Sequence, residues 1–232
     1  DGVPQGSVGQ SLMDLTKFNT GQATVIRGVS FAPKPIIRGS LIYRNWIPNS
    51  QNANGYLYSI PWGLKQGNAS EPQQPQQVFR DSLPEGQRQL KQVGGTVFGG
   101  YYPGVDLSTI APVLVNGYNQ VGNLWPGYIP FVSLASLTAN QFYYDRNNKV
   151  LYVRLATPLA ANEGLEVSAL QFIAKGFNIA NVTLQNLVFE RSNTSTYWRG
   201  GSVLVTGNNL KIDGVEFRDS DSHCLQIEGS GH

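Results

Sequence analysis

Apolar and polar residues alternate in two segments near the end of the chain, and the second segment repeats the first after 28 residues. The two copies read NVTLQNLVFERS at 181–192 and NLKIDGVEFRDS at 209–220. Apolar positions stay apolar in both copies, and the pairs are Val182 with Leu210, Leu184 with Ile212, Leu187 with Val215, and Phe189 with Phe217. A spacing of two residues is the strand period, and the segments are too short and too rich in β-branched residues for helices. The pattern therefore predicts short β-strands that stack on their copies.

A second repeat, with a shorter spacing, extends this stack. The segment VLVTG at 203–207 returns as LQIEG at 225–229, after 22 residues. One coil would contain strands at Val203 to Thr206, Leu210 to Asp213 and Val215 to Arg218, and copies of such a coil share one core. The sequence thus predicts an all-β protein with a right-handed parallel β-helix. The alternative is a meander of hairpins in a β-sandwich, but sandwich strands rarely repeat position by position.

Polar positions between the apolar ones support the same register. The aligned pairs are Glu190 with Arg218, Arg191 with Asp219, and Asn181 with Asn209. The first two pairs bring opposite charges together, which is worth roughly 0.2–1 kcal/mol for a pair on neighbouring strands. The asparagine pair is expected to form a turn ladder, because Asn tolerates left-handed backbone and its amides can hydrogen-bond along a stack.

The pattern changes twice along the chain, which indicates three regions. These are residues 1–42 with an N-terminal segment and the first β-helix strands, residues 43–159 as an inserted antiparallel β subdomain, and residues 160–232 with the parallel coils. Residues 1–21 are rich in Gly and Gln and are expected to be irregular. Thr24 to Arg27 and Pro35 to Arg38 are expected to start the stack, and the coils are expected to resume near Leu165.

The insert carries its own strand signals. Phe142 to Tyr144 and Val150 to Arg154 flank the polar turn DRNNK and predict a hairpin. Val78 to Arg80 and Leu90 to Val93 are further expected strands. The segment SEPQQPQQ at 70–77 holds too much Pro and Gln for a regular element, so it is expected to be an exposed loop.

Composition narrows the classes of function. The 232 residues carry a net charge of +2 with only 14% charged residues, so no nucleic-acid footprint is visible. Abundant amides and hydroxyls are typical of secreted β-rich proteins. One cysteine excludes an internal disulfide, and two histidines leave little for a metal site, so no metal or cofactor is expected. No apolar run is long enough for a membrane span and no leader precedes Asp1, so an exported protein would be the mature form.

The final residues raise the question of what covers the last coil. Ser230, Gly231 and His232 occupy the turn that Asn208 and Asn209 occupy one coil earlier, and the next strand is absent. An open edge of a parallel stack presents unpaired backbone groups and apolar side chains. We therefore expect that the chain lacks a C-terminal part, or that another copy or chain associates with this edge.

Five segments together resemble a known group of proteins. They are PIIRGS, QVFRD and LKQVGG in the insert, QFYYDRNNKVLYVRL, and the coil NVTLQNLVF. Most of residues 24–232 resembles bacterial right-handed β-helix carbohydrate-active proteins of the pectate-lyase-like superfamily, and especially the branch with an inserted β-sandwich-like subdomain that includes β-helical β-xylosidases. The resemblance implies secretion, a saccharide substrate, and acid/base carboxylates on the helix face beyond the insert. It carries over no catalytic residue, because that branch holds its carboxylates in later coils.

The best local candidates for glycoside hydrolysis are Asp219 and Asp221 in RDSDSH, with His223 close by. Hydrolysis needs two carboxyl groups about 5 to 9.5 Å apart, and residues two apart in an extended segment lie about 6 to 7 Å apart. The alternative is structural, since Asp and Ser are common turn residues and Asp219 has a stack partner in Arg191.

A longer loop one coil earlier suggests a substrate groove. The coil that starts at Val182 is six residues longer than the next one, and the additional residues lie in SNTSTYWRGG. Tyr197, Trp198 and Arg199 would then sit beside the acidic loop, where aromatic faces pack on sugars and Arg binds hydroxyls or carboxylates. In the alternative, Trp198 folds back over the coil edge.

These observations leave several functions open. The leading interpretation is the N-terminal part of a secreted, polysaccharide-degrading glycoside hydrolase. A non-catalytic carbohydrate-binding or adhesive β-helix and a filament-forming protein are the alternatives. A polysaccharide lyase would use His223, Arg199 and Lys211 as base and charge-neutralising groups, and it ranks below the hydrolase because no Asp-rich calcium loop accompanies them.

Overall fold

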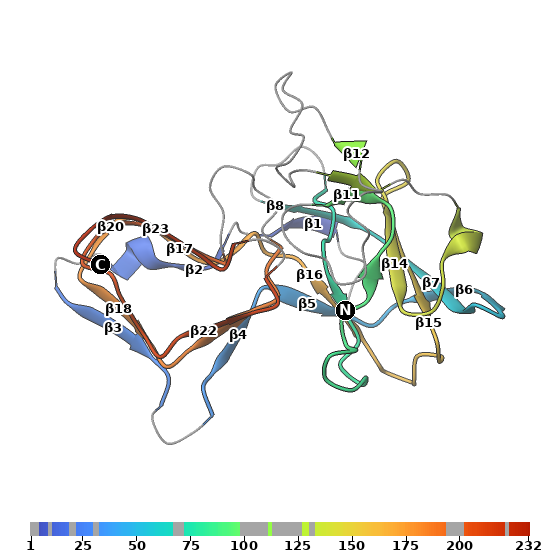
Figure 1. Ribbon diagram of the computed structural model, residues 1–232, viewed down its shortest axis with the longest axis horizontal. Helices are drawn as coiled ribbons and strands as arrows, with labels where there is room; N and C mark the ends of the chain where they lie inside the picture. The colour runs from blue at the N-terminus through green and yellow to red at the C-terminus, as the bar shows by residue number, and fades with distance from the viewer. Residues whose placement is uncertain are drawn as a thin grey trace. The chain divides into compact units, whose positions relative to one another are not determined.

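The computed structural model describes residues 5–8, 11–18, 22–29, 33–66, 72–97, 111–112, 127–129, 133–193, 202–220 and 223–232. These residues form β-strands and two short 3-10 helices, without any α-helix in the described ranges, which confirms the predicted all-β class. The chain divides into two compact units (Figure 1). Unit 1 comprises Asp1–Val8 and Leu41–Ala169, and unit 2 comprises Gly9–Ser40 and Leu170–His232.

Unit 2 consists of three sheets in which strands pair in parallel. Its elements are β2 (Ser11–Asp14), η1 (Leu15–Phe18), β3 (Thr24–Arg27), β4 (Ile36–Arg38), β17 (Phe172–Ala180), β18 (Val182–Gln185), β19 (Val188–Glu190), β20 (Val203–Asn208), β21 (Lys211–Asp213), β22 (Glu216–Arg218) and β23 (Leu225–Ser230). The sheet orders are β2-β17-β20-β23, β3-β18-β21 and β4-β19-β22. In Figure 1 the three sheets form three sides of unit 2, with β17 and β20 on one side, β3 and β18 on the second, and β4 and β22 on the third.

The predicted register of the repeat is confirmed. Leu184 pairs with Ile212, Phe189 with Phe217, and Val203 with Leu225. The two early strands also join the stack as expected, because β3 pairs with β18 and β4 pairs with β19. The coils are expected to resume near Leu165, and the strand found there, β16 (Leu165–Ser168), belongs to unit 1 and pairs antiparallel with β9 (Val78–Phe79).

The apolar core of unit 2 follows from this register. Side chains that repeat at every second position point to one side and form a buried cluster that includes Leu184, Phe189 and Val205, each fully buried. The rings of Phe189 and Phe217 stack with their centroids 5.8 Å apart. Core residues of the first and last coils, such as Ile37 and Phe217, are only partly buried because strands cover them on one side.

The predicted irregular segment at residues 1–21 is wrong in part. Ser11–Asp14 forms β2, which pairs in parallel with β17, and Leu15 is completely buried in the core of unit 2. Only two apolar residues, Leu12 and Met13, occur in β2, and they lack the alternation that marks the later copies. Tertiary pairing with β17 therefore decides the structure of this segment.

Turns between the strands repeat their backbone conformation as well as their sequence. Asn181 and Asn209 have φ angles of 59° and 55°, and the Asn209 side-chain amide donates to Asn181 Oδ1 at 3.0 Å. The asparagine ladder is thus confirmed. The last turn has the same backbone form. Gly231 has a φ of 71°, and the backbone N–H of Asn209 donates to the Ser230 carbonyl at 3.0 Å.

Unit 1 combines antiparallel and parallel pairing. Its elements are β1 (Gln5–Val8), β6 (Ile47–Asn52), β7 (Gly55–Pro61), β8 (Gly63–Gln66), β9, β10 (Lys91–Gln92), β11 (Gly95–Val97), β12 (Ala111–Pro112), β13 (Gly127–Ile129), η3 (Leu134–Ser136), β14 (Gln141–Asp145), β15 (Val150–Leu155) and β16, while β5 (Ser40–Tyr43) spans the border of the units. The largest sheet has the order β10-β14-β15-β7-β6. The predicted hairpin is confirmed, since Phe142 pairs with Val153 in the antiparallel β14–β15 ladder.

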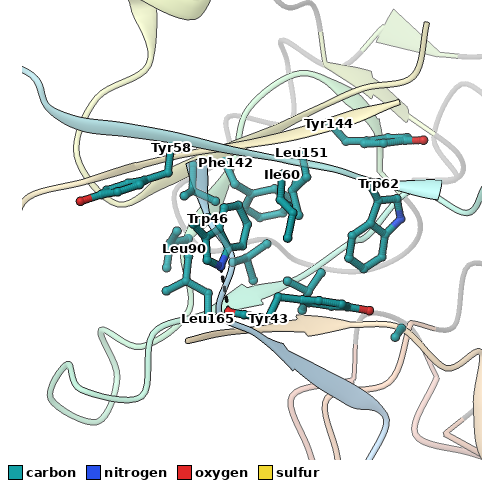
Figure 2. Close-up of a cluster of buried hydrophobic side chains, with 14 of the residues drawn as sticks. Tyr43, Trp46, Tyr58, Ile60, Trp62, Leu90, Phe142, Tyr144, Leu151 and Leu165 are labelled. Atoms are coloured by element: carbon teal, nitrogen blue, oxygen red, sulfur yellow. Dashed lines mark hydrogen bonds between the residues drawn. The ribbon is translucent and has the colours of Figure 1, made fainter. Parts of the chain in front are cut away.

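Aromatic side chains dominate the core of unit 1 (Figure 2). Trp46, Trp62 and Phe142 are buried beneath the sheet with Leu151. Tyr43 packs edge-on against Trp62 at 5.3 Å, and its carbonyl accepts a hydrogen bond from Trp46 Nε1 at 2.9 Å, drawn as the dashed line in Figure 2. The first contact joins residues 19 apart in the sequence and the second is local, so both depend on the particular residues at these positions.

The expected exposed loop at 70–77 is wrong for its described part, residues 72–77. Gln76 and Gln77 are buried, with 0% and 3% of their surface exposed. Backbone partners explain this burial, because the Gln73 amide donates to the Leu64 carbonyl at 3.0 Å and the Gln77 amide donates to Ser168 Oγ at 3.0 Å. A segment without regular structure can be buried once its backbone groups are paired in this way.

A buried ion pair closes another irregular part of unit 1. Arg80 Nε and Nη2 donate to the two carboxylate oxygens of Glu163 at 2.7 and 2.9 Å. Arg80 Nη1 and Nη2 also donate to the carbonyls of Thr157 and Pro158. The Arg80 hydrogen bond, with help from Ser82, lowers the pKa of Glu163 to about 2. The pair therefore fixes the connection between β15 and β16 to the segment after β9.

Candidate functional site

The predicted acidic loop follows β22, at the corner where the chain leaves the sheet β4-β19-β22. Arg191 and Asp219 occupy equivalent positions after β19 and β22, and both have left-handed backbone, with φ angles of 60° and 47°. The Arg191 amide donates to the Arg218 carbonyl at 3.3 Å, and Arg191 Nε lies 4.0 Å from Asp219 Oδ2. The predicted charge pair is thus confirmed, and it forms inside a repeated turn.

Glu190 connects this corner to the rest of the sheet. Arg38 and Arg218 flank it on the neighbouring strands, and Arg38 Nε donates to Glu190 Oε1 at 2.6 Å. Arg191 Nε lies 4.0 Å from the same oxygen. Glu190 and Arg191 are both nearly buried, whereas 46% of the Asp219 side chain is exposed. Of the Glu190 and Asp219 carboxylates, that of Asp219 is therefore the one that solvent and ligands can reach.

Further charges extend the row along β22. Glu216 accepts a hydrogen bond from Lys34 at 2.6 Å and another from Arg218. These bonds lower the pKa of Glu216, and the hydrogen bond to Glu216, with the charges of Glu190 and Asp219, raises the pKa of Arg218. Asp219 therefore faces the positive charges of two arginines, a buried one at position 191 and an exposed one at position 218.

Three serines connect the two loops of the corner, although the apolar pattern of the sequence does not predict a role for them. Ser192 and Ser202, both fully buried, have their Oγ atoms 2.7 Å apart, and Ser202 Oγ donates to Ser220 Oγ at 3.0 Å. Ser192 and Ser220 are equivalent positions of the 28-residue repeat, with Oγ atoms 3.1 Å apart. The repeat of ERS at 190–192 by RDS at 218–220 is a signal for Ser192 and Ser220, but not for Ser202. We call Ser192, Ser202 and Ser220 the serine cluster.

The serine cluster also orders His223. The His223 carbonyl accepts hydrogen bonds from Ser220 Oγ at 3.1 Å and from the Ser202 amide at 3.0 Å, and the residue is exposed. In the sequence, Asp219 directly precedes Ser220 of the serine cluster, and His223 follows Ser220. Asp221, Tyr197, Trp198 and Arg199 lie outside the described residues, so the proposed second carboxylate and the proposed groove are not placed.

The residues assigned to a lyase are not all at this corner. Lys211 lies on β21, in the sheet β3-β18-β21, and its Nζ is 3.8 Å from Asp213 Oδ2. His223 instead follows β22 of another sheet. The described part of the chain holds no group of three or more His, Cys, Asp or Glu residues that could bind a metal ion. Within the same ranges, no helix is long and apolar enough to cross a membrane.

In its described residues, the corner therefore offers the exposed carboxylate of Asp219 near the guanidinium groups of Arg191 and Arg218, on a stack whose connecting loops vary in length. Such a carboxylate can accept a proton or a hydrogen bond, and it can bind a polar ligand together with Arg218. Comparisons with models of protein families, with curated proteins and with solved structures gave no match for this chain.

Proposed function

We propose that the chain belongs to a secreted glycoside hydrolase of the right-handed parallel β-helix type, acting on plant or bacterial polysaccharide. Three sheets of stacked parallel strands, with a register that repeats after 28 and 22 residues, support the β-helix. A right-handed path is the expected one, because crossover connections between parallel strands are right-handed in about 98% of cases. The resemblance to β-helical carbohydrate-active proteins supplies the class of substrate.

The observation that carries the proposed activity is the exposed Asp219 carboxylate beside Arg191 and Arg218. Glycoside hydrolysis pairs a carboxylate that acts as nucleophile or base with a carboxylic acid that protonates the leaving group. A carboxylate that faces positive charges suits the first role, since those charges favour its ionised form. In this proposal Asp219 is the nucleophile or base, Asp221 is the acid, and His223 contacts the substrate at the edge of the site.

The test measures hydrolysis and binding separately. We would incubate the protein with xylo-oligosaccharides and with uronate oligomers, follow the release of reducing ends, and measure binding by calorimetry. Replacing either carboxylate, as Asp219→Asn or Asp221→Asn, should lower the rate by at least about 100-fold while binding persists. Asp213→Asn serves as the control, because Asp213 is a half-exposed carboxylate on β21 in another sheet. Unchanged turnover in both variants would overturn the assignment of these residues.

A non-catalytic carbohydrate-binding protein is the second candidate, and a specific observation favours it. The ion pair with Arg191 and the repeated left-handed turn account for the position of Asp219 without any reaction. In that case calorimetry should detect saccharide binding, and no reducing ends should appear. A lyase would instead release unsaturated uronate products, which absorb ultraviolet light. The separation of Lys211 from the corner ranks the lyase last.

A further inference from the structure

The apolar core of unit 1 uses one face of the five-stranded sheet. Phe142 and Val153 pair in this core, and because side chains alternate along a strand, the next pair of the hairpin lies on the opposite face. On that opposite face, the pairing of β14, β15, β7 and β6 aligns one residue from each strand. These four residues, which we call the platform row, are Tyr143, Tyr152, Ser59 and Ile47.

Two tyrosine rings form one end of the platform row. The rings of Tyr143 and Tyr152 are nearly parallel, with 13° between their planes and 6.5 Å between their centroids, and both side chains are partly exposed. At a contact distance of about 3.5 Å between the planes, this separation leaves a lateral offset of about 5.5 Å. The rings therefore lie side by side rather than one over the other.

A β-bulge adds polar groups to the middle of the platform row. The register of β6 on β7 shifts between Pro48 and Ser50, so Asn49 is the additional residue of the bulge. A bulge changes the direction of a side chain, and here Ser59 Oγ donates to Asn49 Oδ1 at 3.1 Å. Asn49 is exposed, and its side-chain amide also carries two N–H groups that can donate to a ligand.

The neighbouring row on the same face is covered, in contrast to the platform row. Leu57 and Arg154 pair in this neighbouring row and are buried, with 6% and 1% of their surface exposed. Arg154 Nη2 donates to the Leu134 carbonyl of η3 at 3.4 Å, so η3 lies against this row. Ile47, at the other end of the platform row, is 51% exposed. The platform row is therefore accessible beside a covered strip of the sheet.

The platform row carries no charged side chain. Two residues further along β15 and β14, the charged neighbours on this face are Arg154 and Asp145, and both are engaged locally. Arg154 Nη1 donates to Asn52 Oδ1 and to the Gly55 carbonyl. The Asp145 carboxylate accepts from the backbone and side-chain amides of Asn148 in the hairpin turn. The row thus offers aromatic surface, an aliphatic side chain and amide donors to an uncharged ligand.

We propose that the platform row binds a neutral oligosaccharide, at a site in unit 1 that is separate from the acidic corner of unit 2. The class of ligand rests on the proposed function. A saccharide ring has C–H groups on its faces, which pack on tyrosine, and hydroxyl groups at its rim, which accept from Asn49. Four strands about 4.8 Å apart make the row roughly 14 Å long, so it accommodates more than one saccharide ring.

Calorimetry and hydrogen exchange with oligosaccharides test this proposal. The ligands are xylo-oligosaccharides and cello-oligosaccharides, from disaccharide to hexasaccharide, with uronate oligomers for comparison. We expect the affinity for the neutral ligands to increase with their length, because longer chains cover more of the row, and we expect uronate oligomers to bind more weakly. Binding should slow hydrogen exchange in residues 55–61 and 141–155, which form β7, β14 and β15.

Substitutions in the row separate its parts. Tyr152→Ala should raise the dissociation constant of the hexasaccharide roughly tenfold, whereas Tyr152→Phe keeps the ring and should change it less than about twofold. Ile47→Ala alters an exposed side chain at the far end, so it should weaken the longer ligands and leave the disaccharide unaffected. Phe177→Ala is the matched control, because Phe177 is an aromatic residue of β17 in unit 2 that is 42% exposed. Circular dichroism verifies the fold of each variant.

The outcomes of this experiment and of the hydrolase test are distinguishable. Slower exchange at residues 141–155 without release of reducing ends would support the platform and contradict the hydrolase, and the reverse result would contradict the platform alone. Absence of binding by both neutral series, slower exchange confined to unit 2, or equal losses in Tyr152→Ala and Phe177→Ala would each overturn this proposal. Tighter binding of uronate oligomers than of neutral ones would overturn it as well.

Discussion

The segments around the five-stranded sheet of unit 1 are held by individual side chains, whereas unit 2 repeats the same contacts from strand to strand within its parallel sheets. In unit 1, Trp46, Trp62 and Arg80 each fix an irregular segment through side-chain hydrogen bonds of their own. In unit 2, Phe189 on Phe217 and Asn181 on Asn209 are steps of ladders. The difference shows two ways of fixing the position of a β-strand. In unit 1 the strand depends on contacts with unlike side chains, and in unit 2 it depends on contacts with the equivalent residues of the repeat. The effect of a substitution therefore depends on which kind of contact it removes.

The largest effect is expected for a step of the unit 2 backbone ladder. Gly207 has a φ of 140°, and a Cβ atom there would lie 1.9 Å from the Ile179 carbonyl oxygen on the adjacent strand. Gly207→Ala should reduce the free energy of unfolding by about 4 kcal/mol, as the sum of backbone strain and overpacking. Urea denaturation measures the loss, and hydrogen exchange should locate it in residues 170–232.

Gly86→Ala is the matched control for this prediction. Gly86 also has a positive φ of 83°, but a Cβ atom there would meet nothing within 4 Å. Its cost should be the backbone strain alone, about 1 kcal/mol. Equal losses in the two variants would show that the close approach of β17 and β20 is unimportant, and the comparison of the units would lose its main support.

The second prediction concerns the single-copy ion pair of unit 1. Arg80→Ala leaves the Glu163 carboxylate and two carbonyl groups without their buried partner, so it should cost about 3 kcal/mol. The control is Arg88→Ala, because Arg88 is exposed and its Nε donates to the Leu83 carbonyl at 3.1 Å. Hydrogen exchange should increase in residues 72–97 and 150–170, and an increase confined to unit 2 would contradict the assignment.

The same pair predicts a pH dependence. The pKa of Glu163 in the folded protein, about 2, lies below its ordinary value of 4.5. Its contribution is therefore present above about pH 4.5 and is lost as the pH falls towards 2. Urea titrations between pH 5 and 3 should show that the free energy of unfolding decreases less in Arg80→Ala than in the unchanged protein.

The smallest predicted effect separates two properties of one turn. Asn209→Gly keeps the left-handed backbone but removes the hydrogen bond to Asn181, while Asn209→Ala loses both. We expect losses of about 0.5 and about 1.5 kcal/mol. Thermal unfolding monitored by circular dichroism measures both. A glycine variant as unstable as the alanine variant would place the whole effect in the ladder hydrogen bond.

How well the sequence predicts a segment's structure also depends on whether that segment is repeated. The register of β18 on β21 and of β19 on β22 could be predicted, because aligned copies reveal which residues are neighbours. β2 was missed, since its partner β17 lies far along the chain and shares no obvious pattern with it. The composition of residues 72–77 predicts a loop in solvent, because it does not reveal that Leu64 accepts from the Gln73 amide and Ser168 from the Gln77 amide.

The candidate site could be predicted only in part, for a related reason. The Arg191–Asp219 pair was visible in the alignment of the copies. The serine cluster was not, because Ser202 comes from the non-repeated side of the loop and joins the repeated positions only in three dimensions. A sequence repeat thus predicts contacts between positions that align in the two copies, but it does not predict contacts between positions that do not align.

The serine cluster has a consequence for how such a protein can change over time. Hydrogen bonds tie the start of the segment after Ser192 to its end at Ser202, within a buried and fixed frame. Closing a longer loop between fixed ends costs only about 0.6 kcal/mol per doubling of its length. This position can therefore accept insertions, deletions or grafted peptides while β19, β20 and β22 keep their pairing, so the loop can change without a new fold.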